Sequence, residues 1–133
     1  MTVTEAISWL RARVSESRAT RIVIVSAQQD RDTDEPRGVI SVSMDDSDAE
    51  VHLLVNHPPW KAIPQTASLT VDALLAHLAE LPTRCESYHL VSGTWRELDE
   101  EHVARIDWPL EDVVTVEGGA CIAFIERRNF NGK

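Results

Sequence analysis

The chain has 133 residues, of which 43% are hydrophobic and 26% charged, and this balance excludes a disordered or fibrous protein. A formal net charge of −9 would repel nucleic acid and anionic lipid, so we expect neither as a direct partner. The sequence begins without the features of a secretion signal, and it contains no apolar run long enough to span a membrane. These observations predict one domain, 1–133, in the cytoplasm.

Two amphipathic helices are predicted by apolar residues at helical spacing. The first begins after Thr2, which can form a capping box with Glu5. The second follows Thr70 as its N-cap and is stopped by Pro82. Both helices therefore have a start signal in the sequence itself.

Several strands are predicted by β-branched runs and by alternation of apolar and polar residues. The uninterrupted run 22–25 is typical of a strand covered on both faces, and we place it at the centre of the sheet. Residues 40–44 and 51–55 alternate on either side of an acidic turn and predict a hairpin. Further strands are expected at 85–91, 113–117 and 121–125.

The remaining segments are predicted to be loops. Residues 28–38 and 56–68 are polar or rich in proline, and 94–112 is expected to be mostly irregular. Gly118 and Gly119 separate two strand-like runs, as the tight turn of a hairpin requires. The elements together define an α+β fold in which a mixed or antiparallel sheet of about five or six strands packs with two helices.

The order of elements over 37–119 resembles a ubiquitin-like β-grasp domain. The segment LTVDALLAHL is similar to the capped helix of that family, YHLVSGTWREL to its strand, glycine turn and short strand, and EDVVTVEGG to its last strand with two final glycines. The resemblance does not include the helix and strand in 1–29 or the final strand and tail in 120–133. It implies a modifier precursor that is processed after Gly119. The alternative is a simple turn at the glycines, which the apolar run after them favours.

No catalytic or metal-binding signature is present, and we expect no catalytic residue, no metal and no cofactor. Asp30, Asp32 and Asp34 alternate as at the start of a calcium loop. However, Glu35 occupies the position where such a loop needs glycine, and Ser41 the position of its bidentate glutamate. The histidines are scattered and form no helical metal-binding pair.

Cys85 and Cys121 are expected to be free thiols, because their spacing fits neither a metal site nor a disulfide framework. On one strand, Cys85 and His89 would lie ~13 Å apart, too far for a nucleophile and its base. A small cysteine-dependent enzyme, in which either thiol works with a distant histidine, is one alternative function.

The leading hypothesis is a noncatalytic acidic protein-interaction module of the inhibitor, immunity or adaptor type, which binds a basic partner protein. The first helix carries Arg11, Arg13 and Arg18, so the binding face should be a patch and not the whole surface. Tryptophans outside the periodic runs are candidate anchors for such a patch. The candidate interface residues are these tryptophans and the carboxylates of the acidic segments: Trp60, Trp95, Trp108, Asp30, Asp32, Asp34, Glu35, Asp45, Asp46, Asp48, Glu97, Asp99, Glu100 and Glu101.

Overall fold

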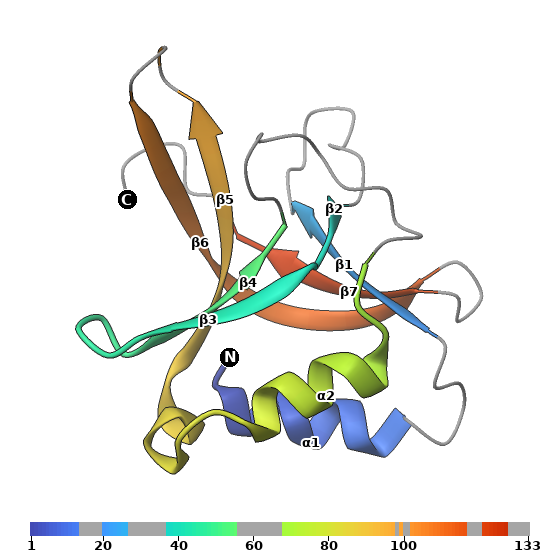
Figure 1. Ribbon diagram of the computed structural model, residues 1–133. Coiled ribbons are helices and arrows are strands. Elements are labelled where there is room, and N and C mark those ends of the chain that lie inside the picture. The colour runs from blue at the N-terminus through green and yellow to red at the C-terminus, as the bar shows by residue number, and fades with distance from the viewer. Residues whose placement is uncertain are drawn as a thin grey trace.

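The computed structural model describes residues 1–13, 20–26, 37–55, 68–97, 99, 102–116 and 121–127. Within these ranges the chain forms helices beneath a curled sheet (Figure 1). In chain order the elements are α1 (Val3–Arg13), β1 (Arg21–Ser26), β2 (Arg37–Gly38), β3 (Ser41–Asp45), β4 (Glu50–Leu54), α2 (Val71–Ala79), the 3-10 helix η2 (Thr83–Ser87), β5 (His89–Glu97), β6 (Val103–Val116) and β7 (Cys121–Glu126).

Both predicted helices are confirmed, and each begins with the capping hydrogen bonds expected from the sequence. Before α1, the N–H of Thr2 donates to Glu5 Oε1 at 3.0 Å, and the N–H of Glu5 donates to Thr2 Oγ1 at 3.2 Å. At α2, Thr70 Oγ1 accepts a hydrogen bond from the N–H of Ala73 at 3.2 Å. These bonds satisfy donors that the first helical turn leaves open, so local sequence determines where both helices start.

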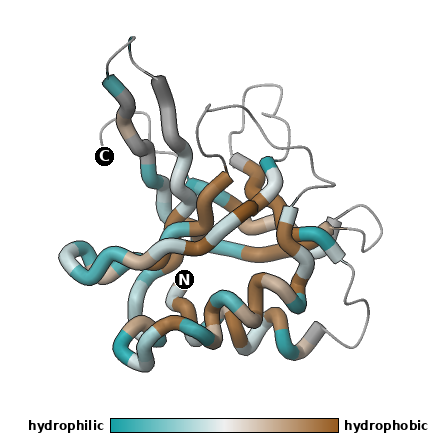
Figure 2. The backbone as a smooth tube through the Cα atoms, viewed as in Figure 1, coloured by the Kyte–Doolittle hydropathy of each residue, from teal (hydrophilic) through white to brown (hydrophobic). Residues whose placement is uncertain are grey.

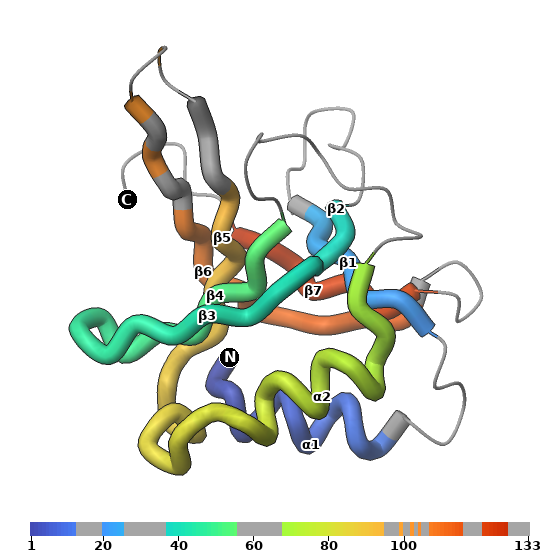
Figure 3. The backbone as a smooth tube through the Cα atoms, viewed as in Figure 1, coloured from blue at the N-terminus to red at the C-terminus, as the bar shows by residue number. Residues whose placement is uncertain are grey.

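The strands form one mixed, seven-stranded sheet in the order β2-β1-β7-β6-β5-β4-β3. β7 runs parallel to β1 and β5 runs parallel to β4, while the other neighbours are antiparallel. The α+β class and the predicted hairpin of β3 and β4 are confirmed, but the sheet has seven strands and not five or six. β1 is buried on both faces as predicted, yet it lies beside the short β2 and not at the centre. Figure 3 shows β1 near β7, although the two lie near opposite ends of the chain.

The strand predicted at 85–91 begins only at His89, so that prediction is partly wrong. Residues Thr83–Ser87 form η2 instead, and the N–H of Cys85 donates to Pro82 O at 2.9 Å. Pro82, which ends the second helix, thus also starts a turn that delays the strand. The distance expected between Cys85 and His89 assumed an extended chain and does not apply.

The segment 94–112, predicted as mostly irregular, instead belongs largely to β5 and β6. The ladder between these strands begins where Val91 pairs with Pro109 and ends where Glu97 pairs with Val103. The second half of β6 pairs with β7. The prediction is wrong because Pro109 and the many charged residues interrupt the alternation of apolar and polar residues by which a strand is recognised. Pro109 is tolerated here because the ladder is already irregular beside it, where the register shifts between Leu110 and Asp112.

The sheet is curled so strongly that a short piece of chain connects its two edge strands, β2 and β3. Only Val39 and Ile40 separate β2, which pairs with β1, from β3, which pairs with β4. The N–H of Val39 donates to Ile22 O at 3.1 Å, and the N–H of Ile40 donates to Leu54 O at 2.9 Å. The main chain at Val39 and Ile40 is therefore hydrogen-bonded to strands near both edges of the sheet. The inner face of the curled sheet encloses a core.

The main core lies between the inner face of the sheet and the helices α1 and α2. Hydrophobic residues line the facing sides of these layers (Figure 2), and α2 supplies the crossover that parallel β4 and β5 require. Neither α-helix in the described ranges has the length and apolar character needed to cross a membrane. The large apolar side chains that are fully buried in this core include Leu10, Ile22, Ile24, Leu53, Leu74, Leu90, Leu110 and Phe124.

A buried polar cluster lies on the inner face of the same sheet. Glu126 of β7 is completely buried, and its Oε2 lies 2.9 Å from Arg37 Nη2 of β2. The Ser92 hydroxyl donates to this carboxylate, and Arg37 Nη1 donates to Thr94 Oγ1 at 3.1 Å. Because β2, β5 and β7 are not neighbours in the strand order, the cluster connects parts of the sheet that no backbone ladder joins.

We expect Glu126→Ala to lower the free energy of unfolding by about 3–5 kcal/mol, because it leaves the Arg37 charge buried without its partner. Urea unfolding monitored by circular dichroism measures the change. The matched control is Glu111→Ala, which removes the exposed partner of Arg127 and should cost no more than about 1 kcal/mol. Equal losses in the two variants would contradict a structural role for the buried cluster.

Candidate functional site

The predicted interface residues that the structure describes lie in three places. Asp45, Asp46 and Asp48 meet at the β3–β4 turn, Asp99 lies between β5 and β6, and Trp108 pairs with Ser92 across the inner face. The side chains of Trp95 and Glu97 lie outside the described part of the chain, although their backbones belong to β5. Residues that lie wholly outside it are Trp60, Asp30, Asp32, Asp34, Glu35, Glu100 and Glu101.

Two of these carboxylates have local structural roles. Asp45 Oδ1 accepts hydrogen bonds from the N–H of Ser47 at 2.9 Å and of Asp48 at 3.3 Å, which holds the turn in shape. Asp99 Oδ1 accepts from the N–H of His102 at 2.9 Å and also lies 2.8 Å from His102 Nδ1. Both acids therefore stabilise the turns in which they lie.

Asp46 is already paired with a cation. Its two oxygens accept hydrogen bonds from Arg84 Nε at 2.9 Å and Nη2 at 3.0 Å, and Tyr88 Oη donates to Oδ1 at 2.5 Å. The hydrogen bonds from Arg84, and then that from Tyr88, lower the pKa of Asp46 from 3.8 to about 2. This bidentate contact fastens the β3–β4 turn to the region of η2. The charge of Asp46 is thereby compensated within the molecule.

We expect the stabilising effect of Asp46 to be lost in acid. Because its pKa is depressed in the folded chain, the contribution is present above the ordinary value of 3.8 and disappears as the pH falls toward about 2. Urea unfolding of the native chain and of Asp46→Asn, from about pH 6 downward, should show the native advantage shrinking over this window. Asp48→Asn is the control, because it removes a charge from the same turn without touching Arg84. A constant difference between native chain and Asp46→Asn would contradict the ion pair.

Among the described residues, a group of one histidine and two carboxylates lies on the outer face, around His52 of β4. His52 Nδ1 lies 3.3 Å from Asp107 Oδ1, and His52 Nε2 lies 3.7 Å from Glu50 Oε1. The imidazole is almost completely buried, whereas both carboxylates are partly exposed. One donor atom from each residue can be chosen so that all lie within 4.8 Å of one another.

Strand register explains how these residues meet although they come from β4 and β6. Glu50 and His52 are two positions apart on one strand and so share a face. Asp107 is paired with Gly93 of β5, the strand that lies between β4 and β6. The backbones of β4 and β6 are two strand spacings apart, about 10 Å. Because Gly93 of the intervening β5 has no side chain, the imidazole of His52 and the carboxylate of Asp107 can meet above it.

Negative charge accumulates around Glu50. Burial raises the pKa of Glu50, the nearby His52 opposes this, and the carboxylates of Asp107, Asp48 and Asp45 raise it further. We call Asp45, Asp48, Glu50 and Asp107 the acidic face.

The sequence predicted part of the acidic face and missed its centre. Asp45 and Asp48 were candidates because they belong to an acidic turn. The signal for Glu50 and His52 was their spacing of two in a predicted strand, which places them on one face. Nothing local pointed to Asp107, since its position depends on the register of a hairpin that the sequence did not predict.

Neither Cys85 nor Cys121 forms a disulfide, and both are buried. Cys85 Sγ lies 3.7 Å from Met44 Sδ in the main core, and Cys121 packs with Val23 and Ala123 on the outer side of β1 and β7. Burial among apolar groups shields a thiol from reagents and from substrate. The surroundings therefore favour packing roles over the cysteine-dependent enzyme.

We expect neither Cys85 nor Cys121 to react with a thiol reagent in the folded chain at about pH 8, while both react after unfolding in urea. The reason is their burial, and the measurement is labelling followed by intact mass. Rapid labelling of either thiol well below that pH in the folded chain would contradict the prediction and favour the enzyme.

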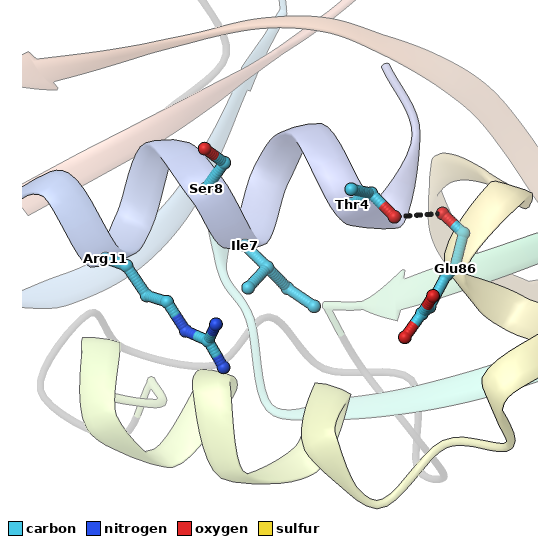
Figure 4. Close-up of a pocket in the computed structure, with 5 residues that line it drawn as sticks. All are labelled: Thr4, Ile7, Ser8, Arg11 and Glu86. Carbon is cyan, nitrogen blue, oxygen red and sulfur yellow. Dashed lines mark hydrogen bonds between the residues drawn. The ribbon is translucent and has the colours of Figure 1, made fainter.

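A small hollow of about 330 Å³ lies on the surface beside α1. Figure 4 shows its lining residues Thr4, Ile7, Ser8 and Arg11 on α1 and Glu86 from η2, with the hydroxyl of Thr4 donating to Glu86 O at 2.8 Å. The hollow combines one cation, one anion and one apolar side chain. It does not select a ligand class, and we assign it no function.

Comparisons of the chain with models of protein families, with curated protein sequences and with solved structures found no match.

Proposed function

We propose that this protein is a noncatalytic interaction module of the inhibitor, immunity or adaptor type, which binds a basic partner protein through the acidic face. The observation that carries the proposal is the accumulation of Asp45, Asp48, Glu50 and Asp107 on one side of the sheet. Three segments of the chain contribute to it: the β3–β4 turn, β4 and β6.

The electrostatics of this face favour a cationic partner. Mutual repulsion makes ionised carboxylates costly where they are close together and partly removed from water, and the raised pKa of Glu50 reflects both effects. An arginine or lysine placed among them would relieve the repulsion. Complementary charge of this kind speeds association and selects partners more than it adds affinity.

The Asp46–Arg84 pair helps to define the edge of the proposed interface. Arg84 of η2 compensates Asp46, so this pair presents no net negative charge beside the acidic face. A basic partner is therefore directed toward Glu50 and Asp107 and away from η2. The sequence predicted a basic surface on the first helix. Of the arginines expected there, Arg11 has a described side chain, and it is exposed on α1.

Processing after Gly119, as in a ubiquitin-like modifier precursor, receives less support. It would remove β7, which lies between β1 and β6 and contributes Ile122 and Phe124 to the core. Loss of an interior strand would leave two unpaired strand edges and open the core to water. The likeness to the β-grasp family concerns 37–119, and the sheet described here extends beyond that range on both sides.

We expect the variant Asp48→Asn, Glu50→Gln, Asp107→Asn to bind a basic partner about tenfold more weakly than the native chain, because three charges leave the proposed interface. The partner is captured from extract on the immobilised chain, purified and titrated at about 50 mM and about 300 mM salt. Native binding should weaken at the higher salt concentration.

The matched control is Asp72→Asn, Glu80→Gln, Glu86→Gln, which removes the same charge from exposed positions on and after α2. It should bind as the native chain does. Binding that is insensitive to salt, or that falls equally in both variants, would contradict the acidic face as the interface. Urea unfolding of both variants excludes loss of folding as the cause.

A further inference from the structure

The side chains of Glu50, His52 and Asp107 provide a donor set that suits a transition metal. Imidazole nitrogen and carboxylate oxygen are the ligands found around zinc, manganese and iron in proteins. Magnesium and calcium prefer oxygen alone, so the histidine distinguishes between the two classes of cation.

The geometry lies near what coordination needs. Ligand atoms around a tetrahedral zinc ion are about 3.4 Å apart, given zinc–ligand bonds of about 2.1 Å. The observed nitrogen–oxygen separations are 3.3 Å for Asp107 and 3.7 Å for Glu50, although they involve different ring nitrogens of His52. One donor atom from each residue lies within 4.8 Å of the other two, so binding one ion requires both carboxylates to turn toward the same ring nitrogen of His52.

Burial differs among the three residues in a way that fits a metal site open on one side. The side chain of His52 is only 1% exposed and is held in place by its surroundings. The side chains of Glu50 and Asp107 are 28% and 29% exposed, so they have room to adjust and an ion has a path from solvent. Water would complete the coordination on the exposed side.

We propose that Glu50, His52 and Asp107 form a binding site for one divalent transition-metal ion of the zinc class. The ion would connect β4 to β6 across β5 at the level of Gly93. This proposal goes beyond the proposed function and does not depend on it, because it concerns the isolated chain. Cation binding here would also reduce the negative charge of the acidic face.

The test is calorimetric titration of the purified, metal-free chain with Zn²⁺, with Mg²⁺ as the comparison. We expect one Zn²⁺ per chain, a raised Tm in its presence, and no comparable effect of Mg²⁺. His52→Ala should abolish Zn²⁺ binding. Because that change could also disturb folding, Glu50→Gln and Asp107→Asn are measured as well, and each should weaken binding at least about tenfold.

Two controls separate the proposed site from nonspecific binding. His102→Ala removes an exposed histidine that contacts Asp99, and Asp72→Asn removes an exposed carboxylate on α2 that belongs to neither proposed site. Both should bind Zn²⁺ as the native chain does. The ¹⁵N signals of the imidazole of His52 should shift when Zn²⁺ is added.

Three results would overturn the proposal: no Zn²⁺ binding by the native chain, binding that survives both Glu50→Gln and Asp107→Asn, or an unchanged His52 signal at saturation. None of these depends on a protein partner. Failure of the metal site is thus distinguishable from failure of the acidic face as an interface.

Discussion

β6 hydrogen-bonds to β5 along its first half and to β7 along its second, so one strand of 14 residues holds the two halves of the sheet together. The register shift between Leu110 and Asp112 marks the change of partner, and irregularities of this kind bend a strand. With β6 bent, the sheet curls far enough for residues 37–45 to reach both of its ends. The enclosed core and the buried cluster both depend on this curl.

Two successive residues of β5, Ser92 and Gly93, lie on opposite faces of the sheet and have different roles there. Ser92 points inward and donates to the buried Glu126, while the next residue, Gly93, leaves space outside for His52 and Asp107. The inner carboxylate is paired with an arginine and accepts a hydrogen bond from the Ser92 hydroxyl, as a buried charge requires. The outer carboxylates of Glu50 and Asp107 are 28% and 29% exposed, so that face and not the inner one is accessible to a cation from outside.

Local signals in the sequence predicted what local interactions determine. Thr2 and Thr70 identified the starts of both helices because capping involves residues three positions apart. The β3–β4 hairpin followed from alternation around a short turn. The parallel pairing of β1 with β7 could not be predicted in this way, because it joins Arg21 to Cys121 and leaves no pattern within either strand.

The same distinction explains the candidate site. The acidic turn was visible in the sequence as a run of carboxylates. The sequence did not show, however, that Arg84 compensates one of them, Asp46. His52 was one of several scattered histidines until pairing placed it between Glu50 and Asp107. Of the three candidate tryptophans Trp60, Trp95 and Trp108, the structure describes the side chain of Trp108, which is half-buried opposite Ser92.

The position of β7 has a consequence for how the protein is made. Ribosomes deliver the chain from the N-terminus, so β1 and β6 both exist before the strand that belongs between them. Until Cys121–Glu126 emerges, two strand edges lack their partner and Arg37 lacks its carboxylate. Until β7 pairs with both, the folding chain exposes two strand edges that could pair with another chain.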